Sequence, residues 1–206
     1  MRSAADKRPS RAAVGCTSPR SILPIIARET PERSASALAD SSWVSRAARS
    51  VAARDVGSES VSFETDPPPP TEMAERIATA VRTHAWVVLE NKGRVVGYAH
   101  GGPFKSRAAY RWACEVSVYL ERGRRRTGGG RALYEALFDR LTERGFRTAV
   151  AGMTLPNDAS VGLHQAMGFR PVGTYRRIGW KHGTWHDVAW VQRTLATSQD
   201  PPAELR

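Results

Sequence analysis

The sequence predicts an α+β domain with a mixed, mostly antiparallel central sheet flanked by helices, preceded by a low-complexity N-terminal extension. Strand-like runs of alternating or apolar residues recur over 85–90, 95–100, 112–120, 148–154, 169–177 and 185–194. Apolar residues with helical spacing fill 133–144 and 160–167, between the later strands. Consecutive strands without an intervening helix favour hairpins, and strands that alternate with helices favour parallel pairs, so a mixed sheet is expected.

Turn and capping residues set the predicted boundaries of these elements. Asn91-Lys92-Gly93-Arg94 is typical of a hairpin turn between the first two strands. Pro67-Pro68-Pro69-Pro70 predicts a stiff linker, after which Thr71 is expected to cap a helix with acidic residues in its first turn. Gly145 and Gly168 stand where the two later helices are expected to end, because glycine readily adopts the left-handed backbone of a C-cap.

Residues 1–60 differ in composition from the rest of the chain, being mostly Ala, Ser and Arg with Trp43 as the single aromatic residue. Such a segment has few side chains to bury, so it is expected to be disordered or aberrant. Three interpretations remain open: a degenerate folded unit, a targeting extension with one acid, Asp6, within residues 2–28, and out-of-frame translation of a GC-rich gene. The predicted domain therefore spans 61–196, followed by a tail at 197–206.

Charge and cysteine content narrow the function classes. The chain carries 31 Lys and Arg against 20 Asp and Glu, a formal charge of +11, which favours an anionic partner. No RNA-binding motif or zinc-finger spacing accompanies the basic residues, so the cluster at Arg122 and 124–126 indicates a cofactor rather than nucleic acid. Cys16 and Cys114 form no disulfide framework, which favours a reducing compartment such as the cytoplasm. No apolar run approaches the roughly 20 residues that span a bilayer, so no membrane partner is expected.

A glycine-rich turn at 125–132, Arg-Arg-Thr-Gly-Gly-Gly-Arg-Ala, separates the strand that ends at Leu120 from the helix predicted at Leu133. Glycines let backbone N–H groups approach a phosphate, and a helix N-terminus favours negative charge. Neither the dinucleotide pattern G-x-G-x-x-G nor the Walker pattern G-K-S/T is present. The turn therefore predicts an anion site of another kind.

Glu115 is the main candidate for acid–base chemistry. Alternation places its side chain on the face of the strand opposite its apolar neighbours Val116 and Val118. A carboxylate in an apolar strand is costly unless it is paired or functional. Glu115 is thus either a general base or a structural partner of Arg107, Arg111 or the neighbouring strand.

Four segments in order carry a resemblance to a known family: GGPFKSRAAYRW at 101–112, RRTGGGRA at 125–132, LPNDAS with HQAMGF at 155–169, and WKHGTWHDV at 180–188. Together they resemble the phosphinothricin N-acetyltransferase branch of the GNAT superfamily, which includes methionine sulfoximine and sulfone acetyltransferases. The resemblance covers roughly Val61 to Leu195.

The resemblance implies a GNAT-like fold, acetyl-CoA as co-substrate, no metal, and a cytoplasmic homodimer. It implies direct transfer of acetyl, in a ternary complex, to the amino group of a small amino-acid-like substrate. Two alternatives remain open: an acetyltransferase for another amine, such as a protein N-terminus, and a non-catalytic CoA-binding remnant with a damaged N-terminal half.

The resemblance also implies roles for individual residues. Glu115 is expected to act as the base and His164 to protonate the departing thiolate, with a half-buried structural histidine as the alternative for His164. Asn157 is expected to bind the cofactor, and an ordinary turn before a helix is the alternative for this residue. An acidic head group of the substrate is expected to bind Lys105, Arg107 or Arg111. The expected cofactor-binding residues are Val118, Tyr119, Leu120, Arg125, Arg126, Thr127, Gly128, Gly129, Gly130, Arg131 and Asn157.

Overall fold

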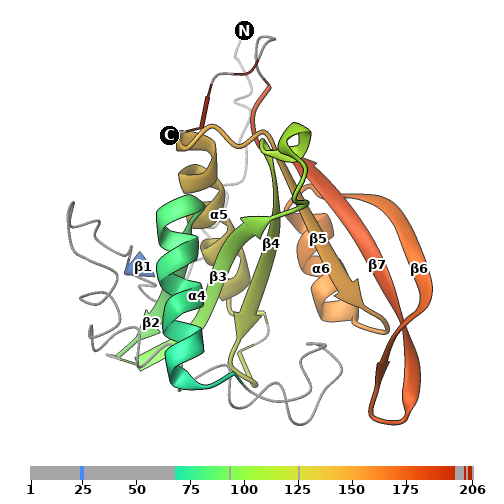
Figure 1. Ribbon diagram of the computed structural model, residues 1–206. Helices are drawn as coiled ribbons and strands as arrows, with labels where there is room; N and C mark the ends of the chain where they lie inside the picture. Colours follow the sequence, from blue (N-terminus) through green and yellow to red (C-terminus); the bar gives the residue numbers. More distant parts are fainter. Residues whose placement is uncertain are drawn as a thin grey trace, which may run out of the picture.

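The computed structural model describes residues 24–25, 68–92, 94–124, 126–197, 202 and 204–205. In this part of the chain seven strands form one sheet in the order β1-β2-β3-β4-β5-β7-β6. Helix α4 lies on one face of the sheet, and α5 and α6 lie on the other (Figure 1). We call these the α4 face and the α5 face.

The bounds of the elements are as follows. The strands are β1 (Pro24–Ile25), β2 (Trp86–Asn91), β3 (Arg94–Pro103), β4 (Ala113–Leu120), β5 (Thr148–Thr154), β6 (Arg170–Lys181) and β7 (Thr184–Thr194). The helices are α4 (Pro70–Thr83), α5 (Gly129–Glu143) and α6 (Asp158–Ala166), with a 3-10 turn, η2, at Ala108–Tyr110.

The sheet is mixed and mostly antiparallel, as predicted. Strands β4 and β5 run parallel, whereas the other neighbouring pairs are antiparallel. A parallel pair needs a crossover connection, and α5 supplies it between β4 and β5. The predicted mixed sheet flanked by helices is therefore present in the described residues.

Two helix starts differ from the prediction. Helix α4 begins at Pro70 with Pro69 in the cap position, so Thr71 lies within the first turn and is not the cap. Proline suits the first helical position because its φ is already helical and its missing N–H would have no partner there. Helix α5 begins at Gly129, four residues before the predicted Leu133, so the last two loop glycines belong to its first turn.

Two apolar clusters hold the helices on the sheet. On the α4 face, Met73 and Ile77 pack against a group that includes Trp86 and Tyr98. On the α5 face, buried residues of α5 at helical spacing pack against the even-numbered residues of β4, among them Cys114 and Val116. Cys114 is a free, buried thiol within this second cluster. Odd-numbered residues of β4 therefore face α4, and this decides where Glu115 points.

The ends of the chain are described only in part. Pro24–Ile25 pair with Leu89 and Val88 of β2, while the remainder of the 1–60 segment lies outside the described residues. In the tail, Glu204 forms an ion pair with Arg111, and Leu205 packs against the cluster of the α5 face. No helix within the described residues is long and apolar enough to cross a membrane.

Candidate active site

Strands β4 and β5 diverge soon after they meet. They pair only where Ala113–Glu115 face Thr148–Val150, although β4 continues to Leu120 and β5 to Thr154. The two ribbons spread apart along the rest of their length (Figure 1). The predicted contact residues Val118, Tyr119 and Leu120 pair with β3 but have no register partner in β5. An extended ligand can therefore align with this edge of β4 by strand-like hydrogen bonds.

The loop after β4 delivers the N-terminus of α5 to the wide end of this divergence. Gly128 is the cap residue of α5, has a left-handed backbone with φ of 82°, and forms no side-chain cap hydrogen bond. A Cβ added at Gly128 would meet nothing within 4 Å, so the backbone is open on this side. The first N–H groups of a helix lack intrahelical partners and attract anions. This open helix N-terminus supports the phosphate site, which stays a prediction. Arg125 lies outside the described residues.

Gly129 and Gly130 are required for close packing of the helix, in contrast to Gly128. A Cβ on Gly129 would approach Leu89 to 2.8 Å, and a Cβ on Gly130 would approach Leu163 to 2.8 Å. Both glycines are buried in the first turn of α5. They allow α5 to pack closely on β2 and α6, which fixes the direction of the helix N-terminus.

Glu121 anchors the basic loop that follows β4 through hydrogen bonds to arginines. Glu121 accepts hydrogen bonds from Arg94 at 2.5 and 2.8 Å and from Arg124 at 3.1 Å. These bonds, led by Arg94, hold the pKa of Glu121 below its usual range. Thr127 also donates its hydroxyl to the carbonyl of Arg124 at 2.9 Å. Arg124 therefore shapes the loop, whereas Arg126 and Arg131 are exposed beside it.

Glu115 lies on the α4 face at the point where β4 and β5 separate. It is half-buried, and this burial raises the pKa of its carboxyl group, while the charge of Lys105 acts in the opposite direction. Its cross-strand partner on β3 is Gly102, where an added Cβ would meet nothing within 4 Å. The carboxylate thus borders open space at the narrow end of the divergence, and Lys105 is close enough to influence its pKa.

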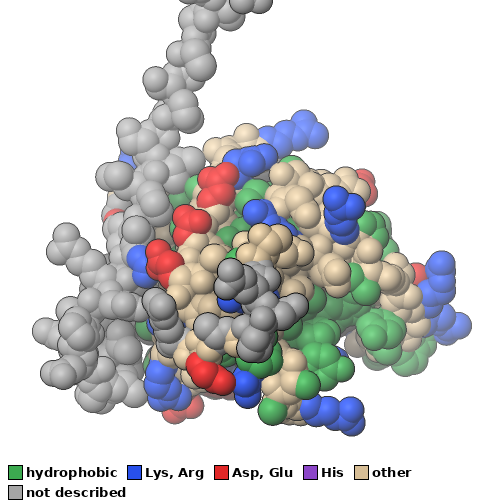
Figure 2. All heavy atoms as spheres, turned by 90° about the horizontal axis from the view of Figure 1, so that it is seen from above, with side chains coloured by type: hydrophobic (Ala, Val, Ile, Leu, Met, Phe, Trp, Pro, Cys, Tyr) green, Lys and Arg blue, Asp and Glu red, His purple; other side chains and the backbone are tan. Residues whose placement is uncertain are grey.

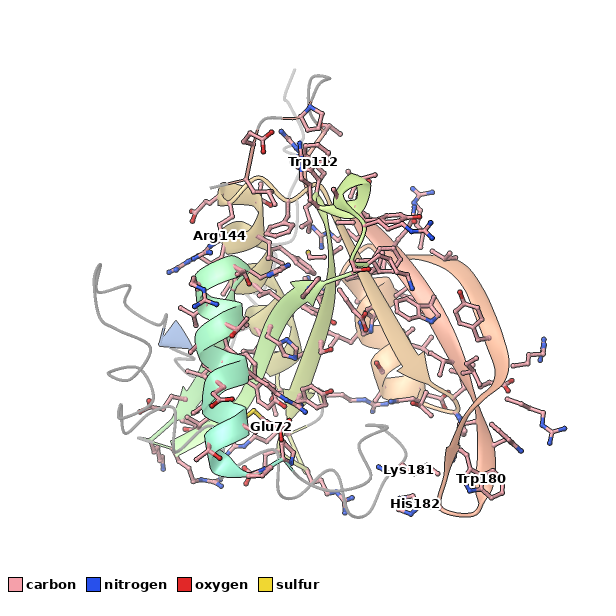
Figure 3. The ribbon with its side chains drawn as sticks, viewed as in Figure 1. Glu72, Trp112, Arg144, Trp180, Lys181 and His182 are labelled. Carbon is pink, nitrogen blue, oxygen red and sulfur yellow. The ribbon has the colours of Figure 1, made fainter. Side chains whose placement is uncertain are left out.

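Among the described residues, Glu115 does not form the predicted structural pair with Arg107 or Arg111. Arg111 pairs with Glu204 at 3.1 Å and stacks on Trp112 with its guanidinium 4.1 Å from the ring. Trp112 directly precedes β4, far from the divergent ends of the strands (Figure 3). Arg107 precedes the 3-10 turn and is exposed. In the part of the chain that the structure describes, no salt bridge joins Glu115 to either arginine. Of the three predicted head-group residues, Lys105 is the one whose charge acts on the pKa of Glu115.

An aromatic wall lies beside this site and was not predicted. Trp190 of β7 is on the same face as Glu115, because Glu115 pairs with Val150, and Gly152 two residues later pairs with Trp190. Phe104 is edge-on to Trp190 at 6.1 Å and to Tyr110 at 5.8 Å. The ammonium of Lys105 lies 5.1 Å from the Phe104 ring. Only the sheet register reveals this wall, since its residues are spread over more than 80 positions.

His164 is on the opposite side of the sheet from Glu115. It is only 3% exposed, more deeply buried than the half-buried helix residue of the alternative. Its Nδ1 lies 2.8 Å from the carbonyl of Ser160, and its Nε2 lies 2.7 Å from the hydroxyl of Tyr134. A carbonyl only accepts, so Nδ1 carries the hydrogen and Nε2 accepts from Tyr134. Burial lowers the pKa of His164, which keeps the ring neutral, and sequence analysis missed Tyr134 as its partner.

Asn157 caps α6, which fits the turn interpretation of this residue. Its Oδ1 accepts a hydrogen bond from the backbone N–H of Ser160 at 3.1 Å. The amide NH₂ of Asn157 is not used in this cap. The cap orients the side chain and does not conflict with a second contact to a ligand.

Comparison with known proteins assigns the family. Residues 48–190 match the family model described as an acetyltransferase (GNAT) domain. The chain belongs to the GNAT acetyltransferase family. The predicted resemblance, fold and enzyme class are therefore confirmed. Among the described residues of this acetyltransferase, no group of three His, Cys, Asp or Glu could hold a metal ion.

Individual relatives show which members of the family this chain is similar to. The chain is 39% identical over 151 residues to the phosphinothricin N-acetyltransferase of Streptomyces viridochromogenes, a match that covers 73% of this chain and 82% of the relative. It is 34% identical over 116 residues to the L-methionine sulfoximine/L-methionine sulfone acetyltransferase of Pseudomonas aeruginosa, covering 56% and 67%. A crystal structure of a GNAT superfamily phosphinothricin acetyltransferase from Sinorhizobium meliloti in complex with AcCoA is similar with a TM-score of 0.71 and 31% identity, covering 84% and 93%.

Proposed function

We propose that this enzyme transfers the acetyl group of acetyl-CoA to the amino group of a small amino-acid-like substrate of the phosphinothricin or methionine sulfoximine type. The observation that carries the proposal is the position of Glu115, which borders open space next to Lys105 where β4 and β5 diverge. The names of the relatives and the AcCoA bound in a similar structure support it.

The cofactor is proposed to bind along the divergence. Its pyrophosphate would accept hydrogen bonds from the backbone N–H groups around Gly128, with the exposed Arg126 and Arg131 near its charge. Its pantetheine arm would follow the edge of β4 from Leu120 towards Val118, and the amide of Asn157 would bind the arm from the other side. This arrangement brings the thioester to the narrow end of the divergence, next to Glu115.

The chemistry would proceed by direct attack. Glu115 takes a proton from the substrate ammonium, and the nitrogen forms a bond to the thioester carbon. A backbone N–H near Val118 would stabilise the developing oxyanion. The C–S bond then breaks while the nitrogen gives its second proton to solvent, and the thiolate would take a proton from solvent through the hydrogen-bonded Tyr134–His164 pair. Because burial raises the pKa of Glu115, this carboxylate is a stronger base than an exposed one.

The substrate would lie on the α4 face of β4 and β5. Lys105 is proposed to bind its acidic head group, assisted by the exposed Arg107, and the ring of Phe104 would pack against its aliphatic part. Arg111 contributes only if it leaves Glu204 and Trp112. A lysine above an aromatic wall fits a small amino acid with an anionic or strongly polar side chain.

Steady-state assays with acetyl-CoA test the proposed function. We expect acetylation of L-phosphinothricin or L-methionine sulfoximine with a kcat/KM at least about ten-fold above that for a peptide with a free N-terminus. The peptide would lack at least one polar contact to the head-group site, and one such contact corresponds to about that factor. A preference for the peptide would favour the second acetyltransferase interpretation. Binding of acetyl-CoA without turnover of any amine would favour the cofactor-binding remnant.

We also propose a cytoplasmic homodimer. Strand β6 is at the edge of the sheet, and an edge strand with exposed apolar side chains tends to be covered by a partner. Figure 2 shows hydrophobic side chains on the side of the molecule that carries β6 and β7, with Lys and Arg around them. The large exposed apolar residues of this hairpin are Val172, Tyr175, Ile178, Trp180 and Trp185.

Light scattering tests the homodimer. We expect a mass about twice that of the 22.6 kDa chain, and we expect Trp180→Lys to shift the protein towards monomer because Trp180 is 58% exposed at the tip of the hairpin. His182→Asn, at the same tip, is the control, since Asn tolerates the left-handed backbone of His182. A monomeric wild-type protein at micromolar concentration would contradict the proposal.

A further inference from the structure

His100 lies next to Glu115 on the α4 face, although it is 15 positions away in sequence. In the β3–β4 register His100 is opposite Ser117, and Gly102 is opposite Glu115. His100 and Glu115 are therefore diagonal neighbours on one sheet face, a spacing that long side chains can bridge. Because Gly102 has no side chain and the space above it is open, nothing on β3 separates His100 from the space that Glu115 borders.

The imidazole of His100 forms one end of an aromatic stack. It lies on Trp86 with a centroid distance of 4.6 Å and an interplanar angle of 11°. Trp86 in turn stacks on Tyr98, and Tyr98 on Tyr119, each at 4.9 Å. Trp86 and Tyr98 are each only 6% exposed, whereas His100 is half-buried. The stack holds the plane of the imidazole, and the partial exposure of His100 leaves the ring within reach of a ligand above Gly102.

The hydrogen-bonding capacity of this ring follows from its surroundings. Burial lowers the pKa of His100 to about 4, and the nearby charges of Arg76 and His84 act in the same direction. The backbone of Gly101 acts in the opposite direction. A neutral imidazole carries a hydrogen on one nitrogen and a lone pair on the other. No partner for that second nitrogen is found among the described residues.

We propose that His100 accepts a hydrogen bond from the amino group of the substrate while Glu115 takes a proton from the same nitrogen. The two contacts fix the nitrogen from two directions and turn its lone pair towards the thioester. The imidazole suits this role because a cation there would repel the incoming ammonium. The inference rests on the proposed function and adds to it a residue that orients the acceptor substrate.

Two substitutions separate this role from a purely structural one. His100→Phe keeps a flat ring on Trp86 but removes the acceptor, and His100→Gln keeps an acceptor but removes the stacked ring. With L-phosphinothricin or L-methionine sulfoximine as the amine, we expect His100→Phe to raise the KM of the amine and to lower kcat/KM by about ten-fold, the effect of one lost hydrogen bond to a polar group. We expect His100→Gln to retain more activity than His100→Phe, with the Kd for acetyl-CoA unchanged in both.

A structural role gives the reverse order, with His100→Phe close to wild type and His100→Gln impaired, and that order would overturn the inference. Tyr98→Phe, which removes a hydroxyl from a buried ring of the same stack, is the control and should leave the KM of the amine near its wild-type value. If the wild-type chain acetylates neither amine nor any other amino acid, the proposed function fails and the inference fails with it. If the wild type is active and the two variants show the reverse order, only the role of His100 is wrong.

Discussion

Replacement of Glu115 by Gln is expected to lower kcat by about 100-fold or more, because a positioned general base contributes about 10²- to 10⁴-fold. Gln has the shape of Glu but cannot take a proton from the amine. The cofactor is proposed to contact the backbone of β4 and the N-terminus of α5, so the Kd for acetyl-CoA should remain unchanged. Glu143→Gln, which removes an exposed carboxylate at the end of α5, is the matched control.

The pH dependence of kcat/KM gives this prediction a second readout. The base must be ionised to act, and burial raises the pKa of Glu115 above its usual value. Activity of the wild type should therefore fall as the pH decreases through this raised pKa, at a higher pH than an exposed glutamate would give. The residual activity of Glu115→Gln should lack this decrease. Near-normal turnover of the variant across the pH range would show that Glu115 is structural.

Much of the fold could be predicted because local patterns decide it. Strand β5 has the predicted bounds, 148–154, since a short apolar run between a glycine turn and a proline turn permits few alternatives. The sequence pattern predicts the start of α5 four residues too late, because glycine is a poor helix former and Gly129 and Gly130 are typical of a loop. Their close approach to Leu89 and Leu163 is a tertiary effect that no local pattern contains.

In the candidate site, too, local patterns predict some features, whereas other features depend on contacts between distant residues. Alternation along β4 was enough to separate Glu115 from its apolar neighbours, and the structure agrees. The environment of Arg111 could not be predicted, because its partner Glu204 is 93 positions away in the tail. The positions of His100 and Trp190 depend on the register of paired strands, which sequence patterns leave open. The Tyr134–His164 hydrogen bond likewise joins two helices that meet only in the folded core.

Replacement of Gly128 by Val is expected to raise the Kd for acetyl-CoA by more than about ten-fold. A side chain at this position would occupy the open space next to the first N–H groups of α5, where the pyrophosphate is proposed to bind. Loss of a single hydrogen bond to a charged group costs about 1.5–3 kcal/mol, which corresponds to at least that factor. Calorimetric titration of the purified full chain with acetyl-CoA measures the change directly.

Valine at Gly128 also introduces backbone strain, because the φ of 82° is unfavourable for a β-branched residue. Gly123→Val is the control for this effect. Gly123 is in the same loop, has a φ of 81°, and has equally open surroundings, but it is not the cap of α5. Strain alone would weaken binding to a similar extent in both variants. A large loss of affinity confined to Gly128→Val, with thermal unfolding similarly affected in the two proteins, would place the pyrophosphate at the α5 N-terminus. Unchanged affinity in a folded Gly128→Val protein would show that the anion binds elsewhere.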